Sequence, residues 1–394
     1  MTVRPVKRKK PLSFRNGLRL VHLTVGLLAG LVLTVTGITG ALMQFEAEIN
    51  EISRPDLWQV TPTATRVPLQ TLKETAEAAH PGETVFFYRL PRRTDRAVVL
   101  QTAERRVFAD PYTGTLKGDL DRKNPTRMEA FFKLVRDLHI TLCSGETGTK
   151  IVGFSAIFLV LSLITGIILW WPKRLALLRQ RLTVKWNARW RRVNYEAHSA
   201  FGFWMTLPLL CMGVSTIYWV FRPNITPLLV RLTKSAPAPR APKLPASAPV
   251  PGTARPAVPV DRYLETAYAA VPGGISLLMS VPDPRRPMVR PVQVWMKTPD
   301  DPMPTGRTTV WVDPRDGALV RVDSAFQTSP ADLIARYNYT VHTGDIAGLP
   351  GRILWAIGSL GLTFLFVGGI VIWRSRGAGV KNPPVRKISP RDAG

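Results

Sequence analysis

The chain has 394 residues, of which 45% are hydrophobic, and its 53 Lys and Arg against 27 Asp and Glu give a net charge of +26. Four stretches nevertheless contain no Asp, Glu, Lys or Arg: Leu20–Phe45, Ile151–Pro172, Ala197–Phe221 and Ile353–Trp373. About 20 apolar residues suffice for a helix to cross a bilayer. The composition therefore excludes a soluble protein with a single core and predicts a membrane α-helical bundle with transmembrane helices at 20–45, 150–172, 197–221 and 352–373.

The excess charge lies in three short segments, residues 1–19, 173–196 and 374–394, which together hold 21 basic and two acidic residues. The positive-inside rule makes them a cytoplasmic tail, loop and tail, so both termini are expected in the cytoplasm. The segments are too short to form the folded basic surface that nucleic acid requires. We therefore expect the lipid bilayer, and no nucleic acid, as a partner.

The two long segments, 46–149 and 222–351, are expected to be external. In the first, Leu69–His80 predicts a helix that ends at Pro-Gly, and three β-branched or aromatic runs predict strands: Thr84–Leu90, Ala97–Thr102 and Arg106–Asp110. The second begins with a Pro/Ala-rich linker, Ser235–Pro259. The same order of helix and strands follows it: Asp261–Val271, Ile275–Val281, Pro291–Met296 and Thr308–Asp313. We therefore expect two external α+β domains.

These similarities indicate that the chain is internally duplicated. Residues 74–82 match residues 265–273 at seven of nine positions, and an Asp-Pro-x-x-Gly turn follows the last predicted strand of each copy. An offset of 203 residues carries His139 onto His342, and an offset of 176 carries His22 onto His198. Each half is then a span, an external domain and a returning span.

The four matched histidines are the candidate ligands of a metal centre. His22 and His198 lie at the cytoplasmic ends of the first and third spans, and His139 and His342 lie just outside the second and fourth. Two imidazoles from facing helices can hold one metal in a bundle core. A haem iron with two histidine ligands has no open position, so it carries electrons instead of binding oxygen. The fifth histidine, His80, matches Val271 and is interpreted as an ordinary exposed residue at a helix end.

Matched glycines fit a flat cofactor beside these histidines. Gly26 and Gly202 follow His22 and His198 by four residues, and Gly37 and Gly213 follow them by fifteen. These positions fall within about 60° of the histidine direction on a helix, which would let a macrocycle approach the backbone. Small residues on one face also mark helix packing, and interfacial histidines are common. Zinc would need further ligands, for which Asp137 and Asp345 are the candidates.

The sequence resembles PepSY-associated transmembrane helix proteins, and its external segments resemble PepSY domains. The motifs that carry the resemblance occur in the same order over nearly the whole chain: His22-x-x-x-Gly26 with Thr36-Gly37, Leu138-His139, Thr165-Gly166-Ile167-Ile168-Leu169-Trp170, and Val341-His342-Thr343-Gly344 before Gly369-Ile370-Val371-Ile372-Trp373. The family includes inner-membrane siderophore reductases of the ferrioxamine-reductase type.

The resemblance implies two b-type haems as cofactors. His22 and His198 would ligate the iron of a cytoplasmic-side haem, and His139 and His342 that of a periplasmic-side haem. The expected activity is reduction of a ferric siderophore in the periplasm, with a quinol or a separate reductase as electron donor. The alternative is a non-redox PepSY protein that senses a signal or inhibits periplasmic peptidases. Transport is disfavoured because the spans lack charged residues.

Overall fold

The computed structural model describes residues 13–235, 241–244, 258–282, 290–301, 303, 306–326 and 329–377. Most of the predicted linker Ser235–Pro259, and most of both terminal tails, lie outside these residues. The chain divides into two compact units. The first unit comprises Met1–Ala41, Asp137–Val220 and Leu354–Gly394, and the second comprises Leu42–Arg136 and Phe221–Ile353.

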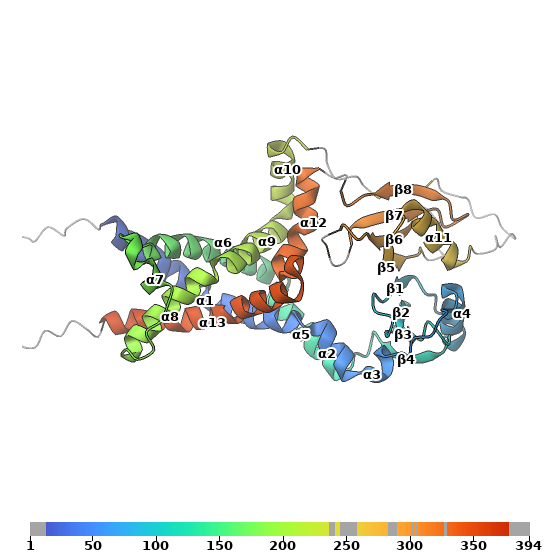
Figure 1. Ribbon diagram of the computed structural model, residues 1–394, viewed down its shortest axis with the longest axis horizontal. Helices are drawn as coiled ribbons and strands as arrows, with labels where there is room; N and C mark the ends of the chain where they lie inside the picture. Colours follow the sequence, from blue (N-terminus) through green and yellow to red (C-terminus); the bar gives the residue numbers. More distant parts are fainter. Residues whose placement is uncertain are drawn as a thin grey trace, which may run out of the picture. The chain divides into compact units, whose positions relative to one another are not determined.

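The first unit is helical (Figure 1). Its long helices are α1 (Phe14–Met43), α6 (Gly145–Trp170), α8 (Trp190–Trp204), α9 (Thr206–Val220) and α13 (Gly348–Gly377), and the short η1 (Leu175–Leu177) and α7 (Leu178–Arg181) follow α6. Three of the described helical segments are long and apolar enough to cross a membrane on their own: Phe14–Met43, Gly145–Trp170 and Asp345–Ser375. The chain is therefore a membrane protein with three to four spans.

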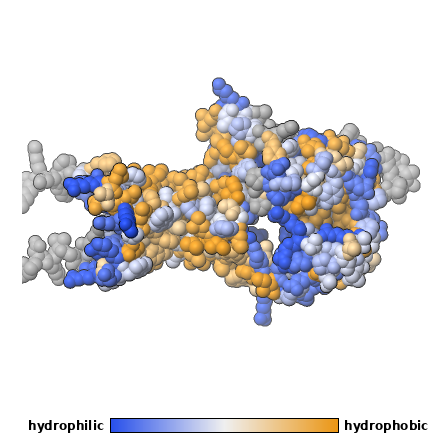
Figure 2. Space-filling model, in the orientation of Figure 1, coloured by the Kyte–Doolittle hydropathy of each residue, from blue (hydrophilic) through white to orange (hydrophobic). Residues whose placement is uncertain are grey.

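The helices of the first unit pack around a small apolar core. It contains Leu159 and Leu163 of α6, Leu209 of α9 and Leu362 of α13, and Leu33 of α1 packs against it. Large apolar side chains also cover the outer surface of the helices, as Figure 2 shows. In a soluble protein such a surface would drive association, whereas in a bilayer it faces lipid.

The predicted third span, 197–221, is not one straight helix. Helices α8 and α9 meet at Met205 and are bent by 61° relative to each other, although together they are long and apolar enough for one crossing. Pro208 accounts for the bend, because proline has no N–H to donate and its ring clashes with the carbonyl four residues earlier. Around the break, Met205 N–H donates to Phe201 O (2.9 Å) and Thr206 Oγ1–H to Gly202 O (2.7 Å).

The second unit contains one eight-stranded antiparallel sheet (Figure 1). Its strands are β1 (Phe87–Arg89), β2 (Val98–Gln101), β3 (Arg105–Ala109), β4 (Leu116–Asp121), β5 (Ile275–Ser280), β6 (Val292–Lys297), β7 (Thr308–Val312) and β8 (Leu319–Asp323). Their order is β4-β3-β2-β1-β5-β6-β7-β8. The strands of the two predicted external domains thus form a single sheet, joined through β1 and β5.

The register of this sheet relates its two halves. Tyr88 of β1 lies opposite Met279 of β5, while Phe87 lies opposite Ser280 and Arg89 opposite Leu278. Tyr88 and Met279 also occupy the same position in their own halves, because they lie opposite Leu100 and Val294 respectively. An approximate two-fold axis therefore passes between β1 and β5.

Helices α4 (Leu69–Ala79) and α11 (Val260–Ala270) cover one face of the sheet, where the main apolar core lies. Each helix caps the start of the other. The Asp261 carboxylate accepts hydrogen bonds from Leu69 N–H (2.7 Å) and Gln70 N–H (2.8 Å), and Gln70 Oε1 accepts one from Val260 N–H (3.1 Å). These bonds pair donors that helix N-termini otherwise leave unsatisfied, and they tie the two halves together.

The predicted helices and the three predicted strands of each half are present, with the first strand shortened to Phe87–Arg89. Strands β4 and β8 were not predicted. The sequence of β4, LKGDLD, contains Gly and two Asp, which are depleted in strands, and all six of its residues are half-buried. Pairing with β3 therefore determines this strand more than its own residues do. The remaining helices are α2 (Glu46–Ser53), α3 (Pro55–Trp58), α5 (Arg127–Thr141), α10 (Arg222–Leu232), α12 (Pro330–Thr343) and η2 (Asp345–Ala347).

Candidate functional site

His22 and His198 both lie in the first unit. His22 is in the third turn of α1, and His198 is in α8, on the N-terminal side of the bend. Both side chains are partly buried. The structure therefore places the two histidines predicted to ligate the first haem in the same helical unit.

The imidazole of His22 is held through one nitrogen. Its Nδ1 lies 3.0 Å from Ser162 O and 3.0 Å from Thr165 Oγ1, both on α6. A backbone carbonyl can only accept, so Nδ1 carries the proton and the lone pair is on Nε2. A histidine that ligates iron commonly donates its other N–H to a carbonyl or carboxylate in this way.

His198 has a related environment with one contact fewer. Its Nδ1 is buried and makes no hydrogen bond of normal geometry with the described residues, although the ring interacts with the backbone of Leu365. Leu365 is 203 residues after Ser162, whose carbonyl oxygen accepts the hydrogen bond from His22 Nδ1–H. The position matching Thr165 is Gly368, which has no hydroxyl.

Glycines make room for the imidazole rings. A Cβ added at Gly166 would lie 3.2 Å from His22 Cε1, and one at Gly369 would lie 3.6 Å from His198 Cε1. Gly166 and Gly369 are matched by the 203-residue offset. One turn after His22 in α1, a Cβ at Gly26 would have only Ser162 Oγ within 4.0 Å. At Gly202, the predicted partner of Gly26, the nearest atom would be Leu365 Cδ2 at 3.6 Å. Both glycines thus have room in front of them.

Gly37 and Gly213 have a different role from the one predicted. A Cβ at Gly37 would overlap the Ser359 carbonyl oxygen of α13, and one at Gly213 would lie 3.0 Å from Val160 Cγ2 of α6. Both glycines therefore permit close helix packing, as small residues do in membrane bundles. A neighbouring helix, not a macrocycle, fills this space.

His139 repeats the arrangement of His22. It lies near the end of α5, and its Nδ1 is 2.8 Å from Thr36 O and 3.2 Å from Thr39 Oγ1 of α1. Again the carbonyl fixes the proton on Nδ1 and the lone pair on Nε2. A Cβ at Gly40 would lie 2.9 Å from His139 Cε1, so this glycine also makes room for a ring.

His342 lies in the last turn of α12, in the second unit. This helix is well delimited, because the Ser329 side chain accepts Asp332 N–H at its start and Gly344 ends it in the left-handed conformation (φ 72°). The side chain of His342 is half-buried. Local capping thus fixes the helix that carries the fourth predicted ligand.

The turns after the two histidine-bearing helices α5 and α12 are alike. Gly145 and Gly348 both have positive φ (57° and 62°). One turn later, a Cβ at Gly148 would overlap Thr141 O, and one at Gly351 would overlap Gly344 O. These positions are matched by the 203-residue offset, so both halves connect the histidine helix to the following span through the same tight junction.

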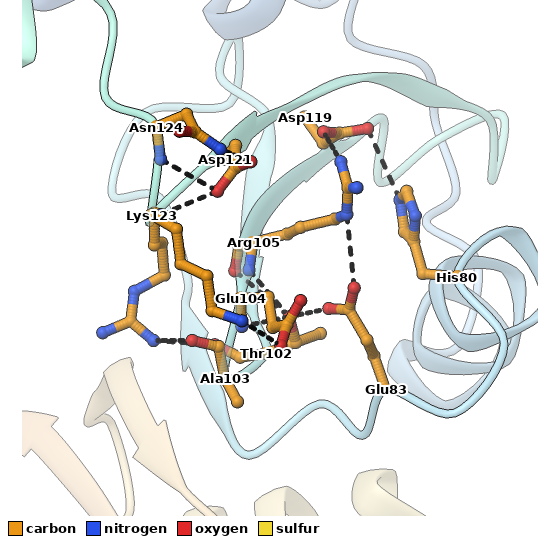
Figure 3. A network of polar contacts seen from close by, with 11 residues as sticks. His80, Glu83, Thr102, Ala103, Glu104, Arg105, Asp119, Asp121, Lys123 and Asn124 are labelled. Atoms are coloured by element: carbon orange, nitrogen blue, oxygen red, sulfur yellow. Dashed lines mark hydrogen bonds and ion pairs between the residues drawn. The ribbon is translucent and has the colours of Figure 1, made fainter.

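His80 lies at a helix end as predicted, but it is not exposed (Figure 3). Its side chain is only 15% exposed and its Nε2 lies 3.5 Å from Asp119 Oδ2. Arg105 donates to Asp119 Oδ1 (2.8 Å) and to Glu83 Oε1 (3.2 Å), and Thr102 also donates to Glu83. The network lies between the end of α4 and strands β3 and β4. Its partners are all within the sheet unit, so its role is to hold that helix end on the sheet.

Sequence reasoning gave no role to the threonines that hold the histidines. Thr36, Thr39 and Thr165 each precede a glycine within an apolar span. The threonine supplies a carbonyl or hydroxyl oxygen, and the glycine beside it makes room for a helix or a ring. The recurring Thr-Gly dipeptide was the signal that could have identified them.

The donor set fits haem better than zinc. Among the described residues, no three His, Cys, Asp or Glu side chains form a group that could hold a metal ion, whereas structural zinc takes four protein ligands and catalytic zinc three. A bis-histidine haem needs two neutral imidazoles with Nε2 unprotonated and a backbone that leaves room. The surroundings of His22, with its Nδ1–H bond and the space at Gly26, meet these needs.

Comparison with known proteins identifies the family. The family described as PepSY-associated TM region matches residues 19–376. No curated protein matches the chain. The chain therefore belongs to the PepSY-associated TM region family.

Proposed function

We propose that this PepSY-associated membrane protein transfers electrons outward across the bacterial inner membrane and reduces ferric siderophores in the periplasm. The bundle has four spans, both termini are cytoplasmic, and the sheet unit is periplasmic. His22 and His198 hold one b-type haem on the cytoplasmic side, and His139 and His342 hold a second on the periplasmic side. When bound, haems with two histidine ligands supply one-electron transfer without an open position on iron.

The observation that carries this proposal is the repeated restraint of a histidine through Nδ1. His22 and His139 sit on different helices, yet each places Nδ1 within 3.0 Å of a backbone carbonyl and near a threonine hydroxyl. A histidine that only filled space would not need the same tautomer at both places. Fixing Nδ1–H orients the ring and keeps Nε2 unprotonated, as ligation of iron requires.

The proposed duplication supports the pairing of the ligands. His22 packs beside Gly166 and Gly26 beside Ser162, while the matched His198 packs beside Gly369 and the matched Gly202 beside Leu365. Both contacts of the first half are thus repeated in the second, with one partner shifted by 176 residues and the other by 203. A two-fold arrangement of this kind supplies one histidine from each half to each site.

The reaction balances as a one-electron reduction. A quinol or a separate reductase gives an electron on the cytoplasmic side, and an external Fe³⁺ chelate accepts it and becomes Fe²⁺. Ferrous iron binds hard oxygen ligands less strongly than ferric iron, so reduction releases the metal. The cytoplasmic loop 173–196 has 24 residues, too few to fold a flavin or nicotinamide domain, so the donor is a separate molecule.

The first test is the absorbance spectrum of the intact protein purified in detergent from haem-replete cells, oxidised and then reduced with dithionite. We expect two low-spin b-type haems per chain, falling to about one in His22→Ala and in His342→Ala. His80→Ala is the matched control and should keep both. A colourless wild-type protein would reject the proposal and leave a non-redox sensor or peptidase inhibitor as the better interpretation.

A further inference from the structure

The face of the sheet opposite α4 and α11 carries two rows of side chains that cross its centre. Residues that lie opposite one another in neighbouring strands share a face. One row is formed by Gln101, Phe87, Ser280, Gln293, Trp311 and Arg321. The next row is formed by Val99, Arg89, Leu278, Trp295, Thr309 and Asp323. The rows thus contain aromatic, aliphatic and polar residues side by side on the central strands.

This face is not a second hydrophobic core across its whole width. In the first half, Leu57 of α3 packs on Phe108 and Val99 in a small apolar cluster. None of the apolar clusters among the described residues includes Phe87, Trp295 or Trp311. Phe87 and Trp295 instead stand side by side across the junction of the two halves, with ring centroids 6.2 Å apart.

The polar residues beside these rings have hydrogen-bonding groups to spare. Arg89 is exposed, and Gln101, Ser280 and Gln293 are partly exposed. Within the described part of the chain, none of these four side chains makes a hydrogen bond or an ion pair. Unpaired donors grouped on one face around aromatic rings are typical of a surface that binds a polar organic ligand.

The electrostatic character of this face is positive. Arg106 lies next to Gln101 in the first row. Burial lowers the pKa of Arg106, and the neighbouring charges of Arg89 and Arg122 lower it further. Among the described residues Glu129 forms an ion pair with Arg106, and the charge of Glu46 also acts on it, so three guanidinium groups lie near two carboxylates.

We propose that this face, centred on Arg89, Phe87, Gln293 and Trp295, binds the external acceptor, and that the acceptor is an anionic ferric chelate. The inference rests on the proposed function and adds the docking surface and the charge of the substrate. Arg89 donates charge-assisted hydrogen bonds to carboxylate or catecholate oxygens of the chelate, while the rings of Phe87 and Trp295 pack against its flat organic part. A chelate with a positive charge is repelled by the same guanidinium groups.

Binding can be tested without reduction by replacing Fe³⁺ with Ga³⁺, which is not reduced under these conditions. The probes are an anionic tris-catecholate complex and a cationic tris-hydroxamate complex that carries a free ammonium group. Each is mixed with the intact protein in nanodiscs of neutral lipid, and retained gallium is counted after ultrafiltration. We expect the anionic probe to bind and the cationic probe to bind at least about tenfold more weakly.

Substitution then locates the site. Arg89→Gln should weaken binding of the anionic probe roughly ten- to hundredfold, Trp295→Ala should also weaken it, and Arg89→Lys should retain part of the affinity. Arg93→Gln is the matched control, since it removes an exposed arginine that lies between β1 and β2 and pairs with Asp95, and should leave binding unchanged. Equal binding of both probes, or full affinity in Arg89→Gln, would overturn the inference.

The haem spectrum separates this result from the proposed function. Charge-selective gallium binding in a colourless protein would support the docking face and reject electron transfer. If the protein contains two haems and the Arg89→Gln variant binds the gallium probe as well as wild type, electron transfer is supported and this face is rejected.

Discussion

The end of helix α4 and the end of helix α11 show how the two halves of the sheet differ. In the first half, His80 faces Asp119 of β4 in the network of Figure 3. The matched positions in the second half are Val271 and Val322, which join the main apolar core. The same backbone thus carries a polar pair in one half and an apolar pair in the other.

The opposite faces of the two half-sheets differ as well. Leu57 covers Phe108 in the first half, whereas the matched Trp311 belongs to no described apolar cluster. By contrast, the glycine contacts of the histidines follow the same offsets in both halves of the bundle. Positions that two similar halves share are those that the common scaffold and the proposed cofactors need, and positions where they differ are free to serve one half alone.

The largest effect is expected where matched glycines differ in the tightness of helix packing. Gly37→Ala should destabilise the protein by about 1–3 kcal/mol, because the new methyl meets backbone atoms of Ser359 that cannot rotate away. Gly213→Ala meets a side-chain methyl and should cost less. Gly17→Ala in the same helix, where a methyl would meet nothing within 4 Å, serves as the control. Thermal midpoints in detergent would check this order, and a Gly37→Ala protein as stable as wild type would contradict the tight approach.

Tyr263 and the matched Leu72 should distinguish the halves at alkaline pH. Burial raises the pKa of Tyr263 to about 12, with Asp313 contributing. Because the folded pKa lies above the unfolded value near 10, the stabilisation is complete below pH ~10 and is lost as the pH rises towards 12. Tyr263→Leu should therefore reduce the loss of stability in this window by up to roughly 2–3 kcal/mol. Unfolding curves from pH 9 to 12 would measure it, and an unchanged slope would contradict the prediction.

The hydroxyl contact of His22, which His198 lacks, can be removed by Thr165→Val. We expect haem retention at that site to fall by about tenfold or more, as for other groups that orient a metal-ligating histidine. Thr206→Val is the control, because Thr206 Oγ1 donates only to Gly202 O of its own helical region. Haem titration of the apoprotein gives the affinities. Equal affinity in the two variants would show that the hydroxyl does not matter.

The reciprocal caps of α4 and α11 are unequal, since the carboxylate of Asp261 accepts two N–H bonds and the amide of Gln70 accepts one. Asp261→Ala should cost about 1–2 kcal/mol and Gln70→Ala about half of that. Hydrogen exchange at the Leu69 and Gln70 amides should accelerate only in the first variant. Glu265→Ala, at an exposed position of α11, is the control. Equal costs in both variants would contradict the asymmetry.

The smallest effect on stability is expected from replacing His80 and Asp119 by the valines found at the matched positions of the second half. His80→Val and Asp119→Val should each cost less than about 1 kcal/mol, because both side chains are partly exposed. The double variant should be less destabilised than the sum, since it removes both partners of the His80–Asp119 contact, while the bond from Arg105 to Asp119 is lost in the Asp119→Val and the double variant alike. A double-mutant cycle on the thermal midpoints measures this, and strict additivity would contradict a coupling between His80 and Asp119.

The sequence was sufficient to predict the apolar helices and the repeated helix-and-strand order, whereas the pairing of His22 with His198 stays a prediction. Hydrophobic length and internal similarity are local properties, so they can be read without a structure. The joining of β1 to β5 depends on pairing between residues about 190 positions apart, such as Tyr88 and Met279, and no local pattern encodes it. Polar strands such as β4 were missed for the same reason.

The residues of the candidate site could likewise be predicted only in part. The histidines could be found by counting and matching, whereas the roles of Thr36, Thr39 and Thr165 depend on which helix lies beside which. Gly37 and Gly213 had the spacing expected of a cofactor groove and instead pack against helices. Spacing alone places a residue on one side of its own helix, and only the neighbouring helix decides what that side contacts.

The bend at Met205 determines how many times the chain crosses the bilayer. Helices α8 and α9 have 15 residues each, so each is about 22 Å long and shorter than the ~30 Å hydrocarbon layer. Neither can complete a crossing alone. If the pair crosses together, the number of crossings is even and both chain ends face the same compartment. If it turns back, the number is odd, and the basic C-terminal tail is left opposite the N-terminal one. Reporter fusions to the two ends would show whether both termini lie on the same side of the membrane.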